Sequence, residues 1–283
     1  MALRLVLRLI SEIANRQQKW IEPMLSLTVD FYVRLFIRVH EGAKPCHESI
    51  GKYSQVFQCL ECEAHYLHPY GLHTFEETTF DKEGKKTKRH VVTKKPEASK
   101  GDEDEEEAKT STRERYQLPK FRIPHQCTVC DGPLIMGGPI WNDPIYNIDF
   151  VKRLLASTRL NAEGENGHKV KTTERIQAIL SAVIDESVLS GTPLSYEFSH
   201  IVSTLKAVNP RKGQILAAFN SLGYLVAQTY YDPKLFKTNA PPEVVYDIFK
   251  AWKNHISGGD PKKVLLNIAE GSLAQRIIQR DPA

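Results

Sequence analysis

The sequence predicts a mixed fold, α/β at its start and α+β overall, and three observations support this. A helical pattern over residues 1–20 leads into an alternating strand pattern over residues 26–39. Two Cys-x-x-Cys pairs, the ligand pattern of a zinc-knuckle region, then flank a long charged segment. Three helical patterns, two short strand patterns and a fourth helical pattern (Val244–Trp252) follow within residues 172–255. That order is typical of a winged-helix-like C-terminal domain.

The composition is that of a globular protein with a modest excess of positive charge. The 283 residues are 41% hydrophobic and 25% charged, and their formal net charge is +4. The length permits one large or two small domains. Because Asp102–Glu107 are all acidic, the rest of the surface is more basic than the average. This balance permits nucleic-acid binding without requiring it.

Residues 1–20 predict an amphipathic helix. Leu5, Leu9 and Ile13 recur on one face, and arginine and glutamate recur on the other. Arg8 interrupts the apolar run, which disfavours a signal peptide, and the stretch is too short and too charged to span a membrane. A helix that starts at residue 2 without a cap suggests that it was cut from something longer.

The clearest strand pattern runs from Ser26 to Val39 and is predicted to be one continuous strand. Bulky residues occupy both alternating sets, so both faces of the strand are expected to be covered. A helix followed by a strand is half of an α/β repeat. Arg34 and Arg38 are candidates for phosphate contact, and solvated or paired strand charges are the alternative.

The two Cys-x-x-Cys pairs predict a structural zinc ion. Each pair can form a tight knuckle, and four thiolates make a closed tetrahedral shell; the predicted ligands are Cys59, Cys62, Cys127 and Cys130. Glycines after the second pair are expected to supply the positive φ angles of its turn. A disulfide, a redox pair and plain buried thiols are the alternatives. Other candidate sulfur or nitrogen groups are Cys46, expected to be a free thiol, and the possible alternative ligands His65, His68 and His73.

The segment between the pairs predicts a disordered insert at residues 76–118. Large apolar side chains are almost absent between Val92 and Tyr116, so the segment cannot bury enough surface to offset its ordering entropy. Lys85–Arg89 could serve as a nuclear targeting patch, although a solvated basic face is the commoner use of such a run. After the second pair, Trp141 is expected to pack over the metal site, and a helix is expected to start near Phe150.

Residues 172–256 predict the winged-helix-like domain. Thr172 or Thr173 caps its first helix, the second begins near Ser195, and the third opens at Asn209 and ends at Gly223. The end of a third helix usually meets nucleic acid in such a unit, and the wing adds phosphate contacts. The candidate contacts are therefore Arg211, Lys212, Lys234 and Lys237. Use of this unit for protein contacts alone is the alternative, and the tail 257–283 predicts one weak helix.

Several of these runs together resemble the tRNA (guanine-26-N2)-dimethyltransferases. The matching runs are Leu25–Val39, Cys127-x-x-Cys130, Gly137–Trp141, Ile148–Val151 and Ala2–Leu5. The resemblance implies an S-adenosylmethionine-dependent enzyme that methylates the exocyclic amine of a guanine in tRNA. It implies that residues 1–45 are the C-terminal remnant of a Rossmann-like methyltransferase domain, contributing its terminal helix and strand. The later residues then comprise a first knuckle (46–75), an insert (76–118), a second knuckle with a linker helix (119–160) and the tRNA-binding domain (172–256).

The sequence departs from this family in one respect. The glycine-rich cofactor loop and the catalytic Asp-Pro-Phe-type motif have no counterpart here, so no catalytic or cofactor-binding residue is transferred from the family. The cysteines transfer as zinc ligands, and the arginines and Lys212 as tRNA contacts. We therefore expect this chain to be incomplete and inactive alone, as the tRNA-binding half of the enzyme. A non-catalytic tRNA- or DNA-binding zinc-ribbon and winged-helix protein is the alternative. The expected location is the nucleus, or else the mitochondrion or cytoplasm, and the oligomeric state is not predicted.

Overall fold

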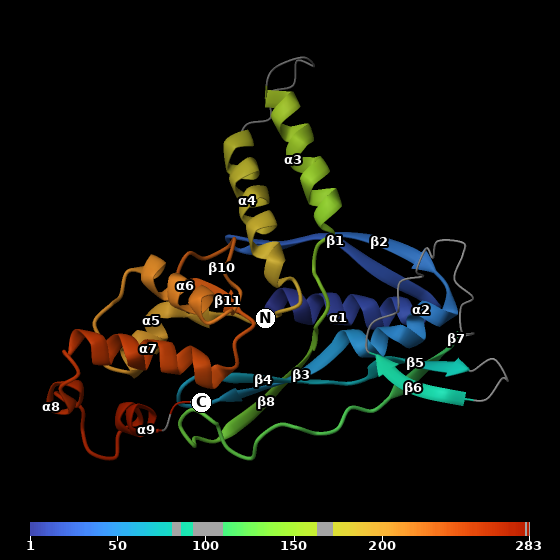
Figure 1. Cartoon of the computed structure of the whole chain (residues 1–283). Helices are drawn as coiled ribbons and strands as arrows, with labels where there is room; N and C mark the ends of the chain where they lie inside the picture. Colours follow the sequence, from blue (N-terminus) through green and yellow to red (C-terminus); the bar gives the residue numbers. More distant parts are fainter. Residues whose placement is uncertain (81–85, 93–109, 163–171, 281, 283) are drawn as a thin grey trace, which may run out of the picture.

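The computed structural model describes residues 1–80, 86–92, 110–162, 172–280 and 282 (Figure 1). The chain opens with the expected amphipathic helix, α1 (Ala2–Asn15), which packs against strand β1 (Lys19–Val29). The predicted single strand at 26–39 is wrong, because β1 and β2 (Tyr32–Glu41) form an antiparallel hairpin. Val29 pairs with Tyr32, and Asp30 adopts a φ of 47° in the turn between them. Aspartate tolerates this left-handed conformation, so Asp30, an acidic residue within a largely apolar run, was the sequence feature that indicated the turn.

Both cysteine pairs lie at the end of a second antiparallel sheet, and Cys59 is the last residue of one of its strands. Helix α2 (Ala43–Glu48) and a 3₁₀ turn (Ser49–Lys52) lead into strand β3 (Tyr53–Cys59), which ends at the first cysteine of the first knuckle. Its neighbours are β4 (His65–Pro69) and β8 (Leu134–Trp141), in the order β4-β3-β8. The register sets Cys59 opposite Leu134, so the second knuckle ends beside the first.

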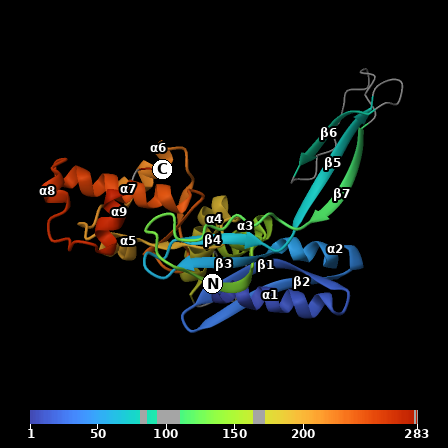
Figure 2. The same cartoon turned by 90° about the horizontal axis from the view of Figure 1, so that it is seen from below.

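A third sheet forms an arm that projects from the body of the molecule (Figure 2). Its strands are β5 (Leu72–Phe80), β6 (Lys86–Val92) and β7 (Thr110–Gln117), in the order β6-β5-β7. The predicted disorder of residues 76–118 is therefore wrong where the chain is described, and 81–85 and 93–109 lie outside the described residues. The prediction of disorder was wrong because it considered only the number of large apolar side chains. Strands can also pair through backbone hydrogen bonds where the residues favour extended backbone, as threonine, valine and tyrosine do.

Helices α3 (Ile148–Ala162) and α4 (Thr173–Glu186) lie side by side and project from the opposite side of the hairpin from α1 (Figure 1). A 3₁₀ turn (Ser187–Leu189) and strand β9 (Tyr196–Glu197) follow α4. The C-terminal elements after β9 are α5 (Phe198–Thr204), α6 (Lys212–Ser221), β10 (Val226–Gln228), β11 (Leu235–Thr238) and α7 (Pro242–Ile256). The three strands form a sheet in the order β10-β11-β9.

The ends of the C-terminal helices differ in part from the prediction. Helix α6 begins at Lys212 instead of Asn209, because the Gln214 side chain accepts a hydrogen bond from the backbone N–H of Arg211 (3.3 Å). It ends as expected before Gly223, whose φ is +81°. The tail forms two short helices, α8 (Pro261–Val264) and α9 (Leu273–Gln279), instead of one. Gly271, with a φ of +70°, separates them.

The buried apolar residues form two clusters. One joins the four knuckle cysteines to the interior of the C-terminal helices, including Tyr246 and Ile277. The other joins α1, β1, β3, α3 and α4, and Trp141 belongs to this one. Trp141 therefore does not cover the cysteines, as its position in the sequence had suggested. Its backbone carbonyl instead accepts a hydrogen bond from the buried Arg4 (2.8 Å).

Candidate metal centre and cationic surface

The two Cys-x-x-Cys segments have the same backbone conformation. The N–H of Cys59 donates to the carbonyl of Ala64 (2.8 Å), and that of Cys127 donates to Gly132 (2.9 Å), five residues later in each case. The residue before the acceptor has a left-handed backbone in both knuckles, with φ of 61° at Glu63 and 59° at Asp131. Within the two knuckles the positive φ predicted for glycines is thus supplied by non-glycine residues, whereas Gly138, farther along on β8, has the predicted positive φ (106°).

Gly132 serves a different purpose. A Cβ atom at this position would lie 3.1 Å from the Sγ atoms of both Cys130 and Cys59. Glycine is therefore needed for the close approach of backbone to sulfur.

The four sulfur atoms converge in the interior. The Sγ atoms of Cys59 and Cys130 are 3.4 Å apart, as are those of Cys62 and Cys127, so each close pair takes one sulfur from each knuckle. All four lie within 4.8 Å of one another and each cysteine is 1% exposed. Zn–S bonds of about 2.3 Å in a tetrahedron require sulfur separations of roughly 3.8 Å, which lies within this range. All four cysteines are free thiols, so neither pair is a disulfide.

Hydrogen bonds favour the ionised form of one of these sulfurs. Backbone N–H groups of Glu61 and Val129 donate to the Sγ atoms of Cys59 and Cys127, each over 3.4 Å. Hydrogen bonds from Cys130 and Cys62 lower the pKa of the Cys127 thiol, whereas the hydrogen bond to Cys127 raises the pKa of each of those two thiols. A group of buried thiolates would repel one another strongly unless a cation lay between them, so the donor set fits a divalent metal.

The other candidate ligands lie apart from this group. The ring of His65 stacks on Tyr196 with 4.3 Å between ring centroids, and burial lowers its pKa to about 4. The ring of His68 lies 5.0 Å from that of Phe121, and the side chain of His73 falls outside the described part of the structure. Cys46 is a free thiol, as expected, and its Sγ donates to the carbonyl of Gly42 (3.1 Å).

Residues distant in sequence hold the knuckles from the C-terminal side. The hydroxyl of Tyr246 on α7 donates to the backbone carbonyl of Cys62. The guanidinium of Arg276 on α9 donates to the carbonyl of Cys130 (2.9 Å) and pairs with Glu61. Sequence reasoning missed both residues, because no local pattern marks a contact between segments so far apart along the chain.

Five of the six predicted tRNA-contact residues are exposed. On the hairpin, Arg34 lies over the ring of Tyr32, 5.4 Å from its centroid, and Arg38 lies 3.5 Å from Glu22. The other three exposed residues lie at the start of α6 and on the neighbouring loop between β10 and β11. Arg211 and Lys212 stand at the start of α6, and the ammonium of Lys212 donates to the carbonyl of Pro233 (2.5 Å) in the loop that carries Lys234.

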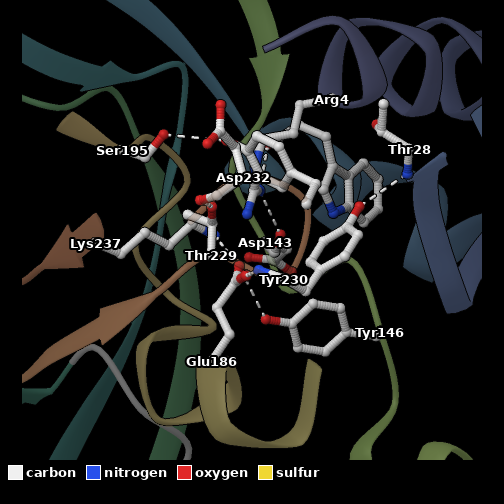
Figure 3. A network of polar contacts seen from close by, with 12 residues as sticks. Arg4, Thr28, Asp143, Tyr146, Glu186, Ser195, Thr229, Tyr230, Asp232 and Lys237 are labelled. Atoms are coloured by element: carbon white, nitrogen blue, oxygen red, sulfur yellow. Dashed lines mark hydrogen bonds and ion pairs between the residues drawn. The ribbon is translucent and has the colours of Figure 1, made fainter. Parts of the chain in front are cut away.

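The predicted surface position of Lys237 is wrong. Its side chain is 5% exposed, and its ammonium lies 2.6 Å from a carboxylate oxygen of the fully buried Glu186 (Figure 3). The reason is that β11 is the middle strand of its sheet and the last residue of α4 covers this face. Burial lowers the pKa of the Lys237 ammonium.

The same carboxylate belongs to a buried polar network that joins the two halves of the chain (Figure 3). The backbone N–H of Tyr230 donates to Glu186 (2.9 Å), and the Tyr146 hydroxyl donates over 3.5 Å. The Tyr230 hydroxyl accepts a hydrogen bond from the backbone N–H of Thr28 on β1 (2.8 Å), and burial raises its pKa to about 12. The sequence carried no signal for this network, because its members lie on separate elements.

The chain also resembles known proteins. The fold is similar to that of Trm1 from Pyrococcus horikoshii, solved with S-adenosyl-L-methionine, at a TM-score of 0.56 and 16% identity. That match covers 87% of this chain and 48% of the other, so the two chains share a class of fold over most of this one. None of the described helices has the length and apolar character needed to cross a membrane.

Two curated relatives match most of this chain. The tRNA (guanine(26)-N(2))-dimethyltransferase of Drosophila melanogaster is 33% identical over 262 residues, and that of Mus musculus is 31% identical over 282 residues. These matches cover 90% and 100% of this chain but only 38% and 36% of the relatives. The model of the N2,N2-dimethylguanosine tRNA methyltransferase family matches residues 1–250. The chain belongs to that family, and it spans little more than a third of the length of these relatives.

Proposed function

We propose that this chain serves the S-adenosylmethionine-dependent dimethylation of the exocyclic amine of guanine 26 in tRNA. The family match over residues 1–250 carries this proposal. Within that reaction we assign to the chain the docking of tRNA. The exposed cations that gather at the start of α6 and on the adjacent loop support this role, because phosphate contacts supply much of the affinity for nucleic acid. We propose the nucleus as its location.

The C-terminal elements are proposed to work as a winged helix. Helices α4, α5 and α6 with the sheet β10-β11-β9 support this reading, in which α6 approaches the RNA with its N-terminal end. Arg211 and Lys212 would then contact phosphate, and Lys234 would act from the loop between β10 and β11. Arg34 and Arg38 on the hairpin are proposed as further contacts. Lys237 is not among them, because it pairs with Glu186 in the interior.

The knuckle cysteines are proposed to hold a structural zinc ion. Four buried sulfurs fill a tetrahedral shell and leave no position for a water molecule or substrate, which is the property of a structural site. Zinc bound there would neutralise the thiolates and join the sheet β4-β3-β8 to the C-terminal helices. Its contribution is to the fold that presents the cations, and no step of methyl transfer needs it.

A competition experiment tests the proposed function. Fluorescent tRNA is bound to the purified chain and displaced with unlabelled tRNA or with duplex DNA of equal phosphate content. We expect tRNA to compete at least about tenfold better, since binding that relies on charge alone would not distinguish the two polyanions. Equal or better competition by duplex DNA would replace this proposal with its alternative, a DNA-binding zinc-ribbon and winged-helix protein. Methyl transfer from labelled S-adenosylmethionine to the bound tRNA would assign the chemistry itself to this chain.

A further inference from the structure

A run of exposed cations follows the arm down to the second knuckle. We call Arg113, Arg115, Lys120 and Arg122 the basic strip, and all four are exposed. The first two lie on β7, an edge strand of the arm, and the others lie in the extended segment between β7 and Cys127. None of them belongs to the surface at α6 described above.

The two strand arginines face away from the body. Successive strand residues point to opposite faces, so Arg113 and Arg115 share one face and Glu114 occupies the other. The carboxylate of Glu114 pairs with Lys44 on α2 (2.8 Å), and the next residue on its face, Tyr116, donates to Glu48 (3.3 Å). The face of Glu114 therefore contacts α2, and the face of the arginines is turned away from it.

The strip carries a net positive charge. Its four cations outnumber the one acidic residue that the β5 register places on the arginine face, Glu76 opposite Arg113. Glu114, the one acid in the sequence from 110 to 126, occupies the other face and pairs with Lys44. An aromatic ring interrupts the cations, since Phe121 is 66% exposed between Lys120 and Arg122. Cations with an interleaved exposed ring suit a phosphodiester backbone that carries bases.

We propose that the basic strip binds the phosphodiester backbone of RNA, as a second contact distinct from the start of α6. This inference rests on the proposed function and adds a surface to it. The arm projects from one half of the molecule and α6 lies in the other half (Figure 2), so one ligand can reach both only if it is a long polyanion. A folded RNA has that extent, whereas a mononucleotide or a free phosphate does not.

The salt dependence of tRNA binding tests the strip. The variant R113Q/R115Q/K120Q/R122Q removes four charges, and the slope of log K against log salt concentration should fall by about one for each phosphate that is no longer neutralised. We expect the slope to fall by about two to four and the binding to weaken at least about tenfold near physiological salt. The half-variant K120Q/R122Q lies outside any strand of the arm and should give a partial effect without disturbing the ladder.

A charge-matched control separates site from bulk charge. Lys152 and Arg153 on α3 and Lys262 and Lys263 on α8 are exposed, and K152Q/R153Q/K262Q/K263Q lowers the net charge by the same amount. Equal slopes for this control and the strip variant would overturn the inference, as would an unchanged slope in both strip variants. If the unmodified chain fails to bind tRNA, the proposed function fails instead, so the two results are distinguishable.

Discussion

His65 lies at the junction of strand β4 and the C-terminal domain, where its ring stacks on Tyr196. Burial disfavours the charged imidazolium and lowers the pKa from its usual 6.5 to about 4. A histidine that closely follows a Cys-x-x-Cys pair resembles a ligand in sequence. The four cysteines would already complete the proposed zinc shell without it. The stacking of His65 on a tyrosine of strand β9 cannot be deduced from local sequence pattern.

The buried imidazole predicts a loss of stability in mild acid. Between pH 6.5 and 4 the unfolded chain binds a proton that folded His65 does not, so the free energy of unfolding decreases as the pH falls through this window. The contribution is at most about 3 kcal/mol. Urea unfolding of the native chain and of His65→Phe, measured from about pH 7 to about pH 4.5, checks it. The variant keeps an aromatic stack and should lose less stability, and the loss of metal in acid affects both proteins. Parallel curves would refute the prediction.

At the scale of elements, hydrophobic periodicity in the sequence located α1, α3 and the helices of the C-terminal domain. It failed where tertiary contacts set the outcome. The reversal at Asp30, the start of α6 and the order of the arm depend on a turn conformation, a capping side chain and strand pairing across the insert. Strand β11 is the clearest case, because its burial depends on both neighbours and on the end of α4.

The Glu186–Lys237 pair predicts an asymmetric response to mutation. Lys237→Met leaves the Glu186 carboxylate buried without its cation, and we expect a loss of about 3 to 5 kcal/mol. The double variant E186Q/K237M removes both charges and should recover much of that loss. Chemical denaturation of the single and double variants checks this, with K234Q on the exposed loop as a control that stays within about 0.5 kcal/mol. Equal destabilisation by K237M and K234Q would show that the ion pair contributes nothing.

At the scale of the whole molecule, the cysteine centre belongs to the core of the C-terminal helices. The sequence predicted that the four cysteines gather in one group, and the structure brings their sulfurs together, since a Cys-x-x-Cys spacing constrains its own geometry. It could not indicate that Tyr246 and Arg276 hold the knuckles in place. Contacts such as these, between segments far apart along the chain, are visible only in the tertiary structure.

This shared core predicts the result of metal removal. A strong chelator should destabilise residues 50–150 and also the C-terminal helices, because their buried side chains belong to the same cluster. Hydrogen exchange followed by peptide, with and without chelator, checks the extent of the change. Helix α1 belongs to the other cluster and provides the internal control. Unchanged protection over α7 in the metal-free protein would contradict the prediction.

The arm leaves and re-enters the body at neighbouring points, because Leu72 at its start pairs with Gln117 at its end. The distance that its ends must bridge is thus independent of how many residues lie between them, and lengthening such a loop costs only about 0.6 kcal/mol per doubling. The arm can therefore be shortened, extended or exchanged for another peptide while the sheet β4-β3-β8 keeps its register. Evolution or protein engineering can change the length and surface of the arm without changing the core of the molecule.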